Sequence, residues 1–210
     1  MYLTEAWLGM RDAMARKLYD AYDWHQAVWE LFPGHADDAR EFLTRIDEIQ
    51  GRYRLYIVSR WEPSPPPWWR APDRTWRTRT IPDSFFGHRA YAFQLRANPT
   101  RKVVKLDAAG QPTKNGRREP LRTREELEAW MQRKAQDSGF EVDLTSLRIT
   151  PAGRSYFRRK EAAGHHAAVE YRGTLRVTDA ARFREAFEKG IGPAKGFGFG
   201  LLVLAPLPEG

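Results

Sequence analysis

Two side chains that are suited to proton transfer lie three residues apart in this sequence. They are His25 and Tyr22, near the start of a helix predicted over residues 22–32. Histidine is the usual proton carrier near neutral pH, and residues three apart on a helix project from the same face. Both side chains could therefore reach one reacting group. A lone helical histidine more often hydrogen-bonds to the backbone, so the pair alone leaves both interpretations open.

The remaining histidines do not predict a metal site. His165 and His166 are adjacent in a predicted strand, where successive side chains point to opposite faces. The sequence has no cysteine, and no grouping of carboxylates with histidines supplies the other ligands that a zinc site needs. We therefore expect neither a metal ion nor another cofactor.

A glycine-rich segment near the end of the sequence could bind phosphate. Residues 190–200 read G-h-G-x5-G-h-G, where h is apolar. Glycine adopts positive φ and lets another backbone approach closely, as a phosphate-binding loop requires. The common nucleotide-binding fingerprints do not fit, because no Gly-Lys-Ser/Thr follows and a helix precedes the loop. We expect contacts with a nucleic-acid backbone through Gly192, Lys195, Gly196 and Gly198; a flexible surface loop is the alternative.

The positive charge is concentrated in the second half of the chain. Residues 1–95 contain 13 Lys+Arg and 13 Asp+Glu, whereas residues 96–210 contain 22 and 14, so the formal net charge of +8 comes from the second half. Such a distribution is typical of a protein that binds a polyanion. A solvated charged surface is the alternative. The candidate binding residues form two clusters, which are Arg96, Asn98, Arg101 and Lys102, then Arg158, Arg159 and Lys160.

The spacing of apolar residues predicts an α+β fold. Helices are expected over 22–32, 37–49, 125–136 and from the cap Asp179 to 189. Strands are expected over 2–8, 53–59, 77–81, 91–97, 100–106, 140–149, 155–160, 166–177 and 201–205, with the proline- and tryptophan-rich residues 61–76 irregular. Each half roughly follows the β-α-β-β-α-β order of a ferredoxin-like (RRM-like) domain. Asn98-Pro99 closes a strand, and we expect two such tandem domains, 1–95 and 96–210.

Three segments in this order resemble one protein family. They are Tyr22-x-x-His25-Gln26-x-x-Trp29-x-Leu31-Phe32, then Phe93-x-Leu95-Arg96-Ala97-Asn98-Pro99-Thr100, then the glycine-rich segment followed by Leu201-Leu202. Together they resemble the CRISPR-associated endoribonuclease CasE family, whose members are the repeat-RNA-processing subunits of the type I-E Cascade complex. The resemblance covers essentially the whole chain.

This resemblance implies a function as well as a fold of two ferredoxin-like domains. Such proteins bind the CRISPR repeat RNA hairpin and cut at its 3′ base without metal. They remain bound to the mature crRNA and act as a subunit of Cascade. The resemblance also implies that His25 is catalytic, as acid or base, with help from Tyr22. A basic hairpin at Arg158 and Arg159 would enter the major groove of the stem, where the end or a distortion of the stem admits it.

Two other interpretations remain open. The chain could be a non-catalytic RNA-hairpin-binding subunit of the same assembly, or a nucleic-acid-binding protein with no link to CRISPR. The absence of cysteine fits a reducing cytoplasm, and no signal peptide or membrane span is predicted. We therefore expect a cytoplasmic location and no membrane partner.

Overall fold

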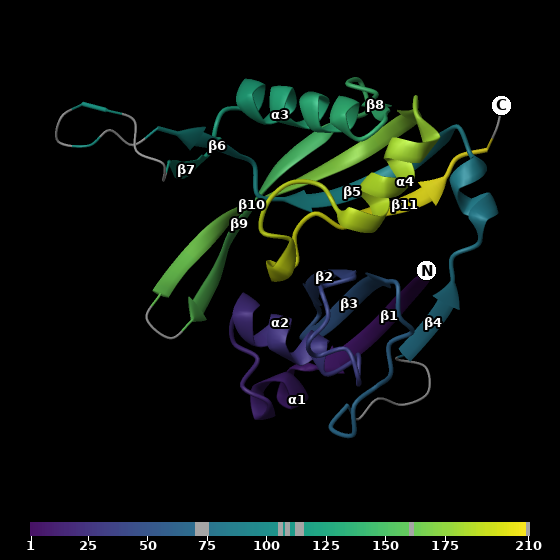
Figure 1. Ribbon diagram of the computed structural model, residues 1–210, viewed down its shortest axis with the longest axis vertical. Coiled ribbons are helices and arrows are strands. Elements are labelled where there is room, and N and C mark those ends of the chain that lie inside the picture. The colour runs from purple at the N-terminus through teal and green to yellow at the C-terminus, as the bar shows by residue number, and fades with distance from the viewer. Residues whose placement is uncertain (70–75, 105–106, 108–109, 112–115, 160–161, 209–210) are drawn as a thin grey trace.

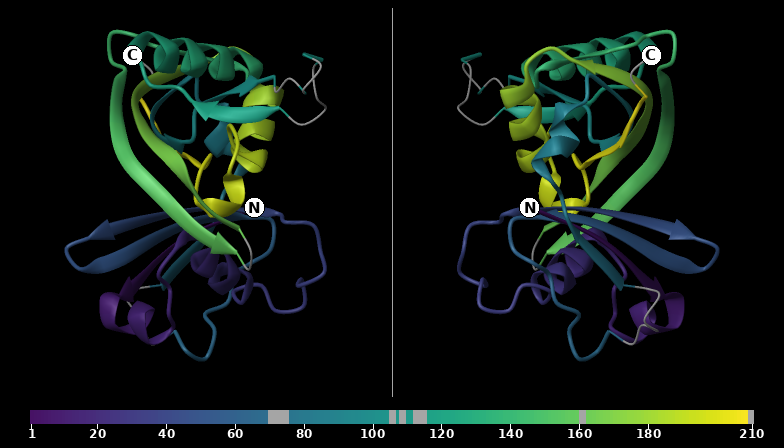
Figure 2. Two further views of the ribbon diagram at one scale, coloured as in Figure 1. Left: turned by 90° about the vertical axis from the view of Figure 1, so that its left-hand side faces the viewer. Right: turned by 90° about the vertical axis from the view of Figure 1, so that its right-hand side faces the viewer.

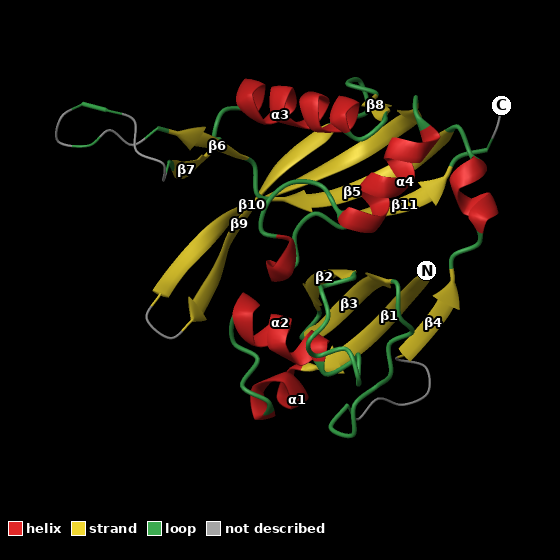
Figure 3. Cartoon of the chain, viewed as in Figure 1, coloured by secondary structure: helices red, strands yellow, loops and turns green. Residues whose placement is uncertain are grey.

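The chain folds into two large antiparallel β-sheets with helices packed on them (Figure 1, Figure 3). The computed structural model describes residues 1–69, 76–104, 107, 110–111, 116–159 and 162–208. Its combination of helices and antiparallel sheets confirms the predicted α+β class. Each sheet has a hydrophobic core of its own.

The first sheet has the strand order β2-β3-β1-β4. Its strands are β1 (Tyr2–Gly9), β2 (Phe42–Ile49), β3 (Arg52–Ser59) and β4 (Trp76–Thr80). Helices α1 (Met10–Ala15) and α2 (Ala21–Trp29) lie between β1 and β2 in the chain and pack against this sheet. The core between them contains Leu8, Trp24, Val28, Leu55 and Ile57.

The second sheet has the strand order β11-β5-β10-β8, with β9 paired to β10. Its strands are β5 (Ala90–Ala97), β8 (Phe140–Val142), β9 (Arg148–Arg159), β10 (Ala162–Val177) and β11 (Leu202–Pro206). Helices α3 (Arg124–Asp137) and α4 (Ala180–Lys189) pack on it. The smaller elements are β6 (Thr100–Val103), β7 (Arg117–Pro120), and the 3-10 turns η2 (Asp83–Gly87) and η3 (Lys195–Phe197).

Strands β9 and β10 form a long ribbon that leaves the second sheet and reaches α2 (Figure 1, Figure 2). The pairing register shifts between Ala167 and Val169, where one residue of β10 lies opposite two residues of β9, which marks a bulge in β9. Beyond the bulge the side chains alternate. Phe157 is half-buried, whereas Tyr156 and Arg158 are exposed. The ribbon thus carries residues of the second half to the first.

The helix predicted over residues 37–49 is wrong, because this segment contains strand β2. Phe42 packs in the core of the first sheet, while the next residue, Leu43, packs in the core of the second. Both faces of β2 are therefore buried. A strand buried on both faces reads as a continuous apolar run, and such a run does not distinguish a strand from a buried helix.

Two further boundaries differ from the predictions. The division expected at residues 95/96 falls inside β5, which belongs to the second sheet, so the two sheets separate between β4 and β5. The strand expected over 140–149 is interrupted by a turn after β8, and β9 begins at Arg148. Residues 61–69 are irregular, as expected, and among the described residues no helix lies between β3 and β4. In the described part of the first half, both helices, α1 and α2, lie between β1 and β2.

A buried network of charged side chains joins the two sheets. Arg45 of β2 donates to both carboxylate oxygens of Asp47 (2.9 and 3.1 Å) and to both of Glu170 on β10 (3.1 and 3.2 Å). Arg96 of β5 donates to Glu170 (2.6 Å), to Asp47 (2.7 Å) and to the Ile46 carbonyl. Only 4% of the Arg45 side chain is exposed, so these carboxylates, rather than water, stabilise its positive charge.

The network also sets the ionisation of Asp47. Burial alone would raise the pKa of this carboxyl, but hydrogen bonds and charge from Arg45, with the charges of Arg96 and Arg54, lower the pKa below its ordinary value. A lowered folded-state pKa means that the interaction stabilises the fold above the unfolded pKa. That contribution is lost as the pH falls through the folded value.

We predict that Arg45→Met destabilises the protein by about 3–5 kcal/mol, because it leaves two buried carboxylates without their main partner. Urea titration followed by circular dichroism measures this free energy of unfolding. Arg101→Met is the matched control, and it should change the free energy of unfolding little because the Arg101 side chain is 60% exposed. Equal effects of the two substitutions would contradict a structural role for the network.

Candidate active site

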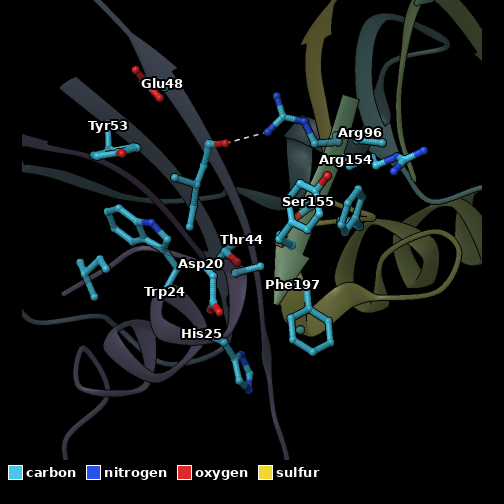
Figure 4. Close-up of a pocket in the computed structure, with 18 of the residues that line it drawn as sticks. Asp20, Trp24, His25, Thr44, Glu48, Tyr53, Arg96, Arg154, Ser155 and Phe197 are labelled. Atoms are coloured by element: carbon cyan, nitrogen blue, oxygen red, sulfur yellow. Dashed lines mark hydrogen bonds between the residues drawn. The ribbon is translucent and has the colours of Figure 1, made fainter. Parts of the chain in front are cut away.

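A cleft of about 410 Å³ lies between the two halves, and its walls come from both. The first half contributes residues of α2 and β2, and the second contributes residues of β9 and the glycine-rich loop (Figure 4). His25 and Phe197 lie at one end of the cleft, and Arg96 lies at the other. A ligand in this cleft would touch both halves at once.

His25 occupies a half-buried position on α2. The indole N–H of Trp29 donates to His25 Nε2 (3.3 Å), so the neutral imidazole carries its proton on Nδ1. Burial lowers the pKa of His25, and the nearby charge of Arg40 lowers it further. The imidazole is therefore neutral at neutral pH. It can exchange a proton with a ligand once the ligand changes its surroundings.

The glycine-rich loop closes one side of the cleft. It is tied in place because Ile191 N–H donates to the Gly200 carbonyl and Gly200 N–H donates to the Arg96 carbonyl. Ile191 and Phe199 are buried, which argues against a flexible surface loop. A Cβ on Gly200 would lie 2.8 Å from the Ile191 carbonyl oxygen, so the loop needs glycine there. Gly196 and Gly198 line the cleft.

The other two predicted loop residues face a second, basic groove. Gly192 and Lys195 line a space of about 470 Å³ together with Arg118, Arg133 and Lys134. Burial lowers the pKa of Lys195, and the charges of Arg40, Lys134 and Lys189 lower it further. The loop therefore separates two cavities rather than facing one.

Stacked rings connect the ribbon to His25. Phe157 of β9 stacks on His166 (ring centroids 4.9 Å apart) and on Phe197 (5.1 Å), and Phe197 lies 6.3 Å from the His25 ring. Asn98 donates to His166 Nδ1 (3.0 Å). Asn98 itself is buried, and within the described residues it serves to orient His166.

Asp20 attaches the start of α2 to the ribbon. One carboxylate oxygen caps the helix by accepting from the backbone N–H groups of Tyr22 (2.7 Å) and Asp23 (3.0 Å). The other oxygen accepts from the backbone N–H of Arg158 (2.7 Å). A single side chain therefore fixes both the helix that carries His25 and the strand that carries Arg158.

Tyr22 and His25 lie on the same helix, but of the two only His25 lines the cleft. Tyr22 lies on α2, but it is not among the lining residues of the cleft, and its hydroxyl accepts from the Gln26 amide (3.3 Å). Arg96 does line the cleft, yet its guanidinium is committed to Glu170, Asp47 and the Ile46 carbonyl. Its main contacts are thus within the protein.

The remaining predicted binding residues are spread over the surface of the second half. Arg101 forms ion pairs with Glu119 and Glu126 on the short β6–β7 ribbon and α3, and Lys102 is exposed beside it. Arg158 is exposed near the tip of the long ribbon, where it lines a hollow together with Asp20 and Tyr19. Arg159 ends β9, and Lys160 lies outside the described residues.

Sequence reasoning missed three residues of the site: Arg40 and the hydrogen-bond partner Trp29 beside His25, and Arg154, which lines the cleft near Arg96. Trp29 stands four residues after His25, a spacing that could have indicated contact on a helix. Nothing in the sequence indicates Arg40, because it belongs to an irregular segment before β2. Its place depends on how the second half packs.

Two negative results apply to the described ranges. There, no group of three or more histidine, cysteine, aspartate or glutamate residues could hold a metal ion. No helix in the same ranges is long and apolar enough to cross a membrane.

We predict that Asp20→Asn separates the two roles of this side chain. Asparagine caps helices as well as aspartate does, but its amide nitrogen would face the N–H of Arg158, so that hydrogen bond is lost. Hydrogen exchange at the Arg158 amide should speed up about tenfold or more, as expected for losing a bond to a charged acceptor. Asp179→Asn is the matched control at the cap of α4. An unchanged Arg158 exchange rate in Asp20→Asn would contradict the attachment.

Known sequences resemble this chain over nearly its whole length. A family model described as "CRISPR associated protein" matches residues 1–206. The CRISPR system Cascade subunit CasE of Escherichia coli (strain K12) is 30% identical over 192 residues, which cover 90% of this chain and 93% of that protein. The CRISPR-associated endoribonuclease Cse3 of Thermus thermophilus is 27% identical over 98% of this chain and 100% of its own length.

Solved structures agree with this relationship. The CRISPR-associated protein Cas6e from Escherichia coli str. K-12 superposes with a TM-score of 0.73 at 26% identity, covering 99% of this chain and 100% of that one. A CRISPR endoribonuclease Cse3 bound to 19-nucleotide RNA also gives a TM-score of 0.73 at 26% identity, covering 98% and 100%. The chain belongs to the CRISPR-associated CasE family, also called Cse3 and Cas6e, of the type I-E Cascade system.

Proposed function

We propose that this protein is a metal-independent endoribonuclease that binds the CRISPR repeat hairpin, cleaves precursor CRISPR RNA at the 3′ base of the stem, and stays bound to the mature crRNA as a Cascade subunit. The observation that carries the proposal is the position of His25, in a cleft formed by both halves and beside the glycine-rich loop. The relatives support it, since one is named an endoribonuclease and another a Cascade subunit.

We further propose that the two halves are tandem ferredoxin-like domains that divide between β4 and β5. The second half supports this, because apart from β6, β7, β9 and η3 its elements follow the order β5-α3-β8-β10-α4-β11, and its strand order is β11-β5-β10-β8. The first half has the matching strand order β2-β3-β1-β4, with an irregular segment where a second helix would stand. The cleft then lies between the domains.

The proposed reaction is an internal attack within the RNA. The ribose 2′-oxygen forms a bond to the adjacent phosphorus while the bond from phosphorus to the 5′-oxygen breaks. The 2′-OH loses its proton and the departing 5′-oxygen gains one, so the products are a 2′,3′-cyclic phosphate and a 5′-OH. His25 performs one of these proton transfers. Tyr22, whose hydroxyl bonds Gln26 in this state, has an assisting role.

The pH dependence of the cleavage rate distinguishes the two roles of His25. If His25 is the base, the rate rises as the pH passes its lowered pKa and then levels off, because the neutral form reacts. If it is the acid, the rate falls above that pKa. Tyr22→Phe should slow cleavage less than His25→Ala does, because water can replace an assisting hydroxyl more easily than a proton-transfer group.

We predict that His25→Ala slows single-turnover cleavage of a repeat hairpin by about 10²- to 10⁴-fold while the hairpin affinity stays within a few-fold, since a proton-transfer group contributes mainly to rate. Wild-type cleavage should continue in excess EDTA, because no step uses a metal-activated water. A substrate with a single 2′-deoxyribose 5′ of the scissile phosphate should bind but remain uncut. Cleavage of the deoxy substrate would contradict internal attack, and inhibition by EDTA would contradict metal independence.

The same experiment tests the rival function, a non-catalytic hairpin-binding subunit. That protein would bind the repeat hairpin as tightly but leave it intact, and His25→Ala would change nothing. A protein that bound unrelated stems equally well would instead be a general RNA-binding protein. Sequence-selective binding with His25-dependent cleavage excludes both alternatives.

We predict that replacing Arg158 and Arg159 with glutamate removes most of the affinity for the repeat hairpin, because it replaces two cations by anions at the end of the ribbon. The log-log slope of affinity against salt should become shallower by about 0.7–0.9 per lost phosphate contact. Arg176→Glu is the control, because Arg176 lies near the other end of β10 and its side chain is 70% exposed. An unchanged slope would mean that the ribbon arginines do not contact phosphate.

A further inference from the structure

Arg40 lies immediately beside His25, although 15 positions separate them in the chain. A Cβ placed on Gly196 would be 3.2 Å from Arg40 Nη1, 3.5 Å from His25 Cε1 and 3.7 Å from His25 Nδ1. The guanidinium and the Cε1–Nδ1 edge of the imidazole therefore both lie against Gly196, and His25 and Gly196 line the cleft. Residue 196 is glycine for reasons of space, because a Cβ would crowd Arg40 Nη1, whereas its φ is not in the left-handed region.

Arg40 has no acidic partner among the described residues, although it is partly buried. Among the described residues, the other buried or half-buried arginines are Arg45, Arg54 and Arg96. All three form ion pairs with carboxylates. The charges that act between Arg40 and its neighbours are instead positive. Arg40 lowers the pKa of both His25 and Lys195, and burial lowers the pKa of Arg40 itself.

Partly buried cations without counter-ions raise the free energy of the folded state. A bound anion would remove that cost, and a guanidinium presents paired N–H donors that match two oxygens of one phosphate. The cleft wall at Gly196 adjoins both the guanidinium and the protonated Nδ1 of His25. An anion seated there would receive donors from both groups.

We propose that Arg40, the His25 Nδ1 edge and the cleft wall at Gly196 form the binding site for the scissile phosphate, with Arg40 donating to its non-bridging oxygens. The proposal rests on the proposed endoribonuclease function and assigns that function a phosphate-binding residue. Lys195 lies in the groove on the other side of the loop, and its charge interacts with that of Arg40. Arg40 stabilises the charge that grows on these oxygens as the 2′-oxygen attacks.

The electrostatic surroundings of His25 make the proposal measurable without RNA cleavage. The groups that face His25 are Trp29 on its own helix, Arg40 before β2, Phe42 on β2 and Phe197 on η3. Of these, Arg40 carries the charge. Its removal should raise the pKa of His25. A phosphate bound beside Arg40 should also raise it, because the anion offsets the Arg40 charge.

The test compares Arg40→Gln, Arg40→Lys and Gly196→Ala with the control Arg60→Gln, whose side chain is 73% exposed and pairs with Glu41. Arg40→Gln should slow single-turnover cleavage by saturating protein about 10²- to 10³-fold, as loss of one oxyanion donor does. Arg40→Lys should recover part of the rate. Gly196→Ala should also slow cleavage, because its methyl group would lie 3.2 Å from Arg40 Nη1 and displace the guanidinium. Arg60→Gln should cleave like the wild type.

An NMR titration of His25 Cε1–H with inorganic phosphate provides the second readout. Phosphate should shift this signal in the wild type and much less in Arg40→Gln. Normal cleavage by Arg40→Gln, or equal phosphate shifts in both proteins, would overturn the phosphate site and leave the endoribonuclease intact. Failure of the wild type to cut the all-ribose hairpin, with an Arg40-dependent phosphate shift, would overturn the endoribonuclease and retain the site.

Discussion

The contact between the two sheets depends on one buried ion cluster. Arg45 and Asp47 of β2 contact Arg96 of β5 and Glu170 of β10. The ion pairs of Arg45 with Glu170 and of Arg96 with Asp47 form only when both halves are in place. Apolar packing could tolerate a small shift between the halves, but bidentate ion pairs fix distance and direction. The cleft lies directly beside this cluster, so the geometry of His25 relative to the loop is set by it.

The elements that depend on local sequence were predictable. Helix α3 and the Asp179 cap of α4 follow from spacing and capping residues, and His25 and the glycine-rich loop follow from a motif. Strand β2 was not, because its two faces enter different cores and the helical and strand patterns become indistinguishable. Arg96 shows the same limit, since its partners are 49 and 74 positions away. Arg40 too acquires its neighbours only through packing.

The same contacts position the proposed RNA-binding ribbon and the helix that carries His25. Asp20 holds the start of the helix that carries His25 and the backbone of the strand that carries Arg158. The rings of Phe157, His166 and Phe197 then pack continuously from the ribbon towards His25. RNA that displaced the ribbon would therefore also move the surroundings of His25. The position of bound RNA at the ribbon and the geometry around His25 are coupled through these few contacts.

The alternation of side chains along β9 limits how the ribbon can change over evolution. Phe157 faces inward towards Phe197, while its neighbours Tyr156 and Arg158 face outward. Gly164, opposite Phe157, leaves room for that ring, since a Cβ there would lie 2.8 Å from it. Inserting or deleting one residue would exchange the inward and outward sets. Descendants can therefore lengthen or shorten this ribbon in steps of two, or must acquire a second bulge to restore the phase.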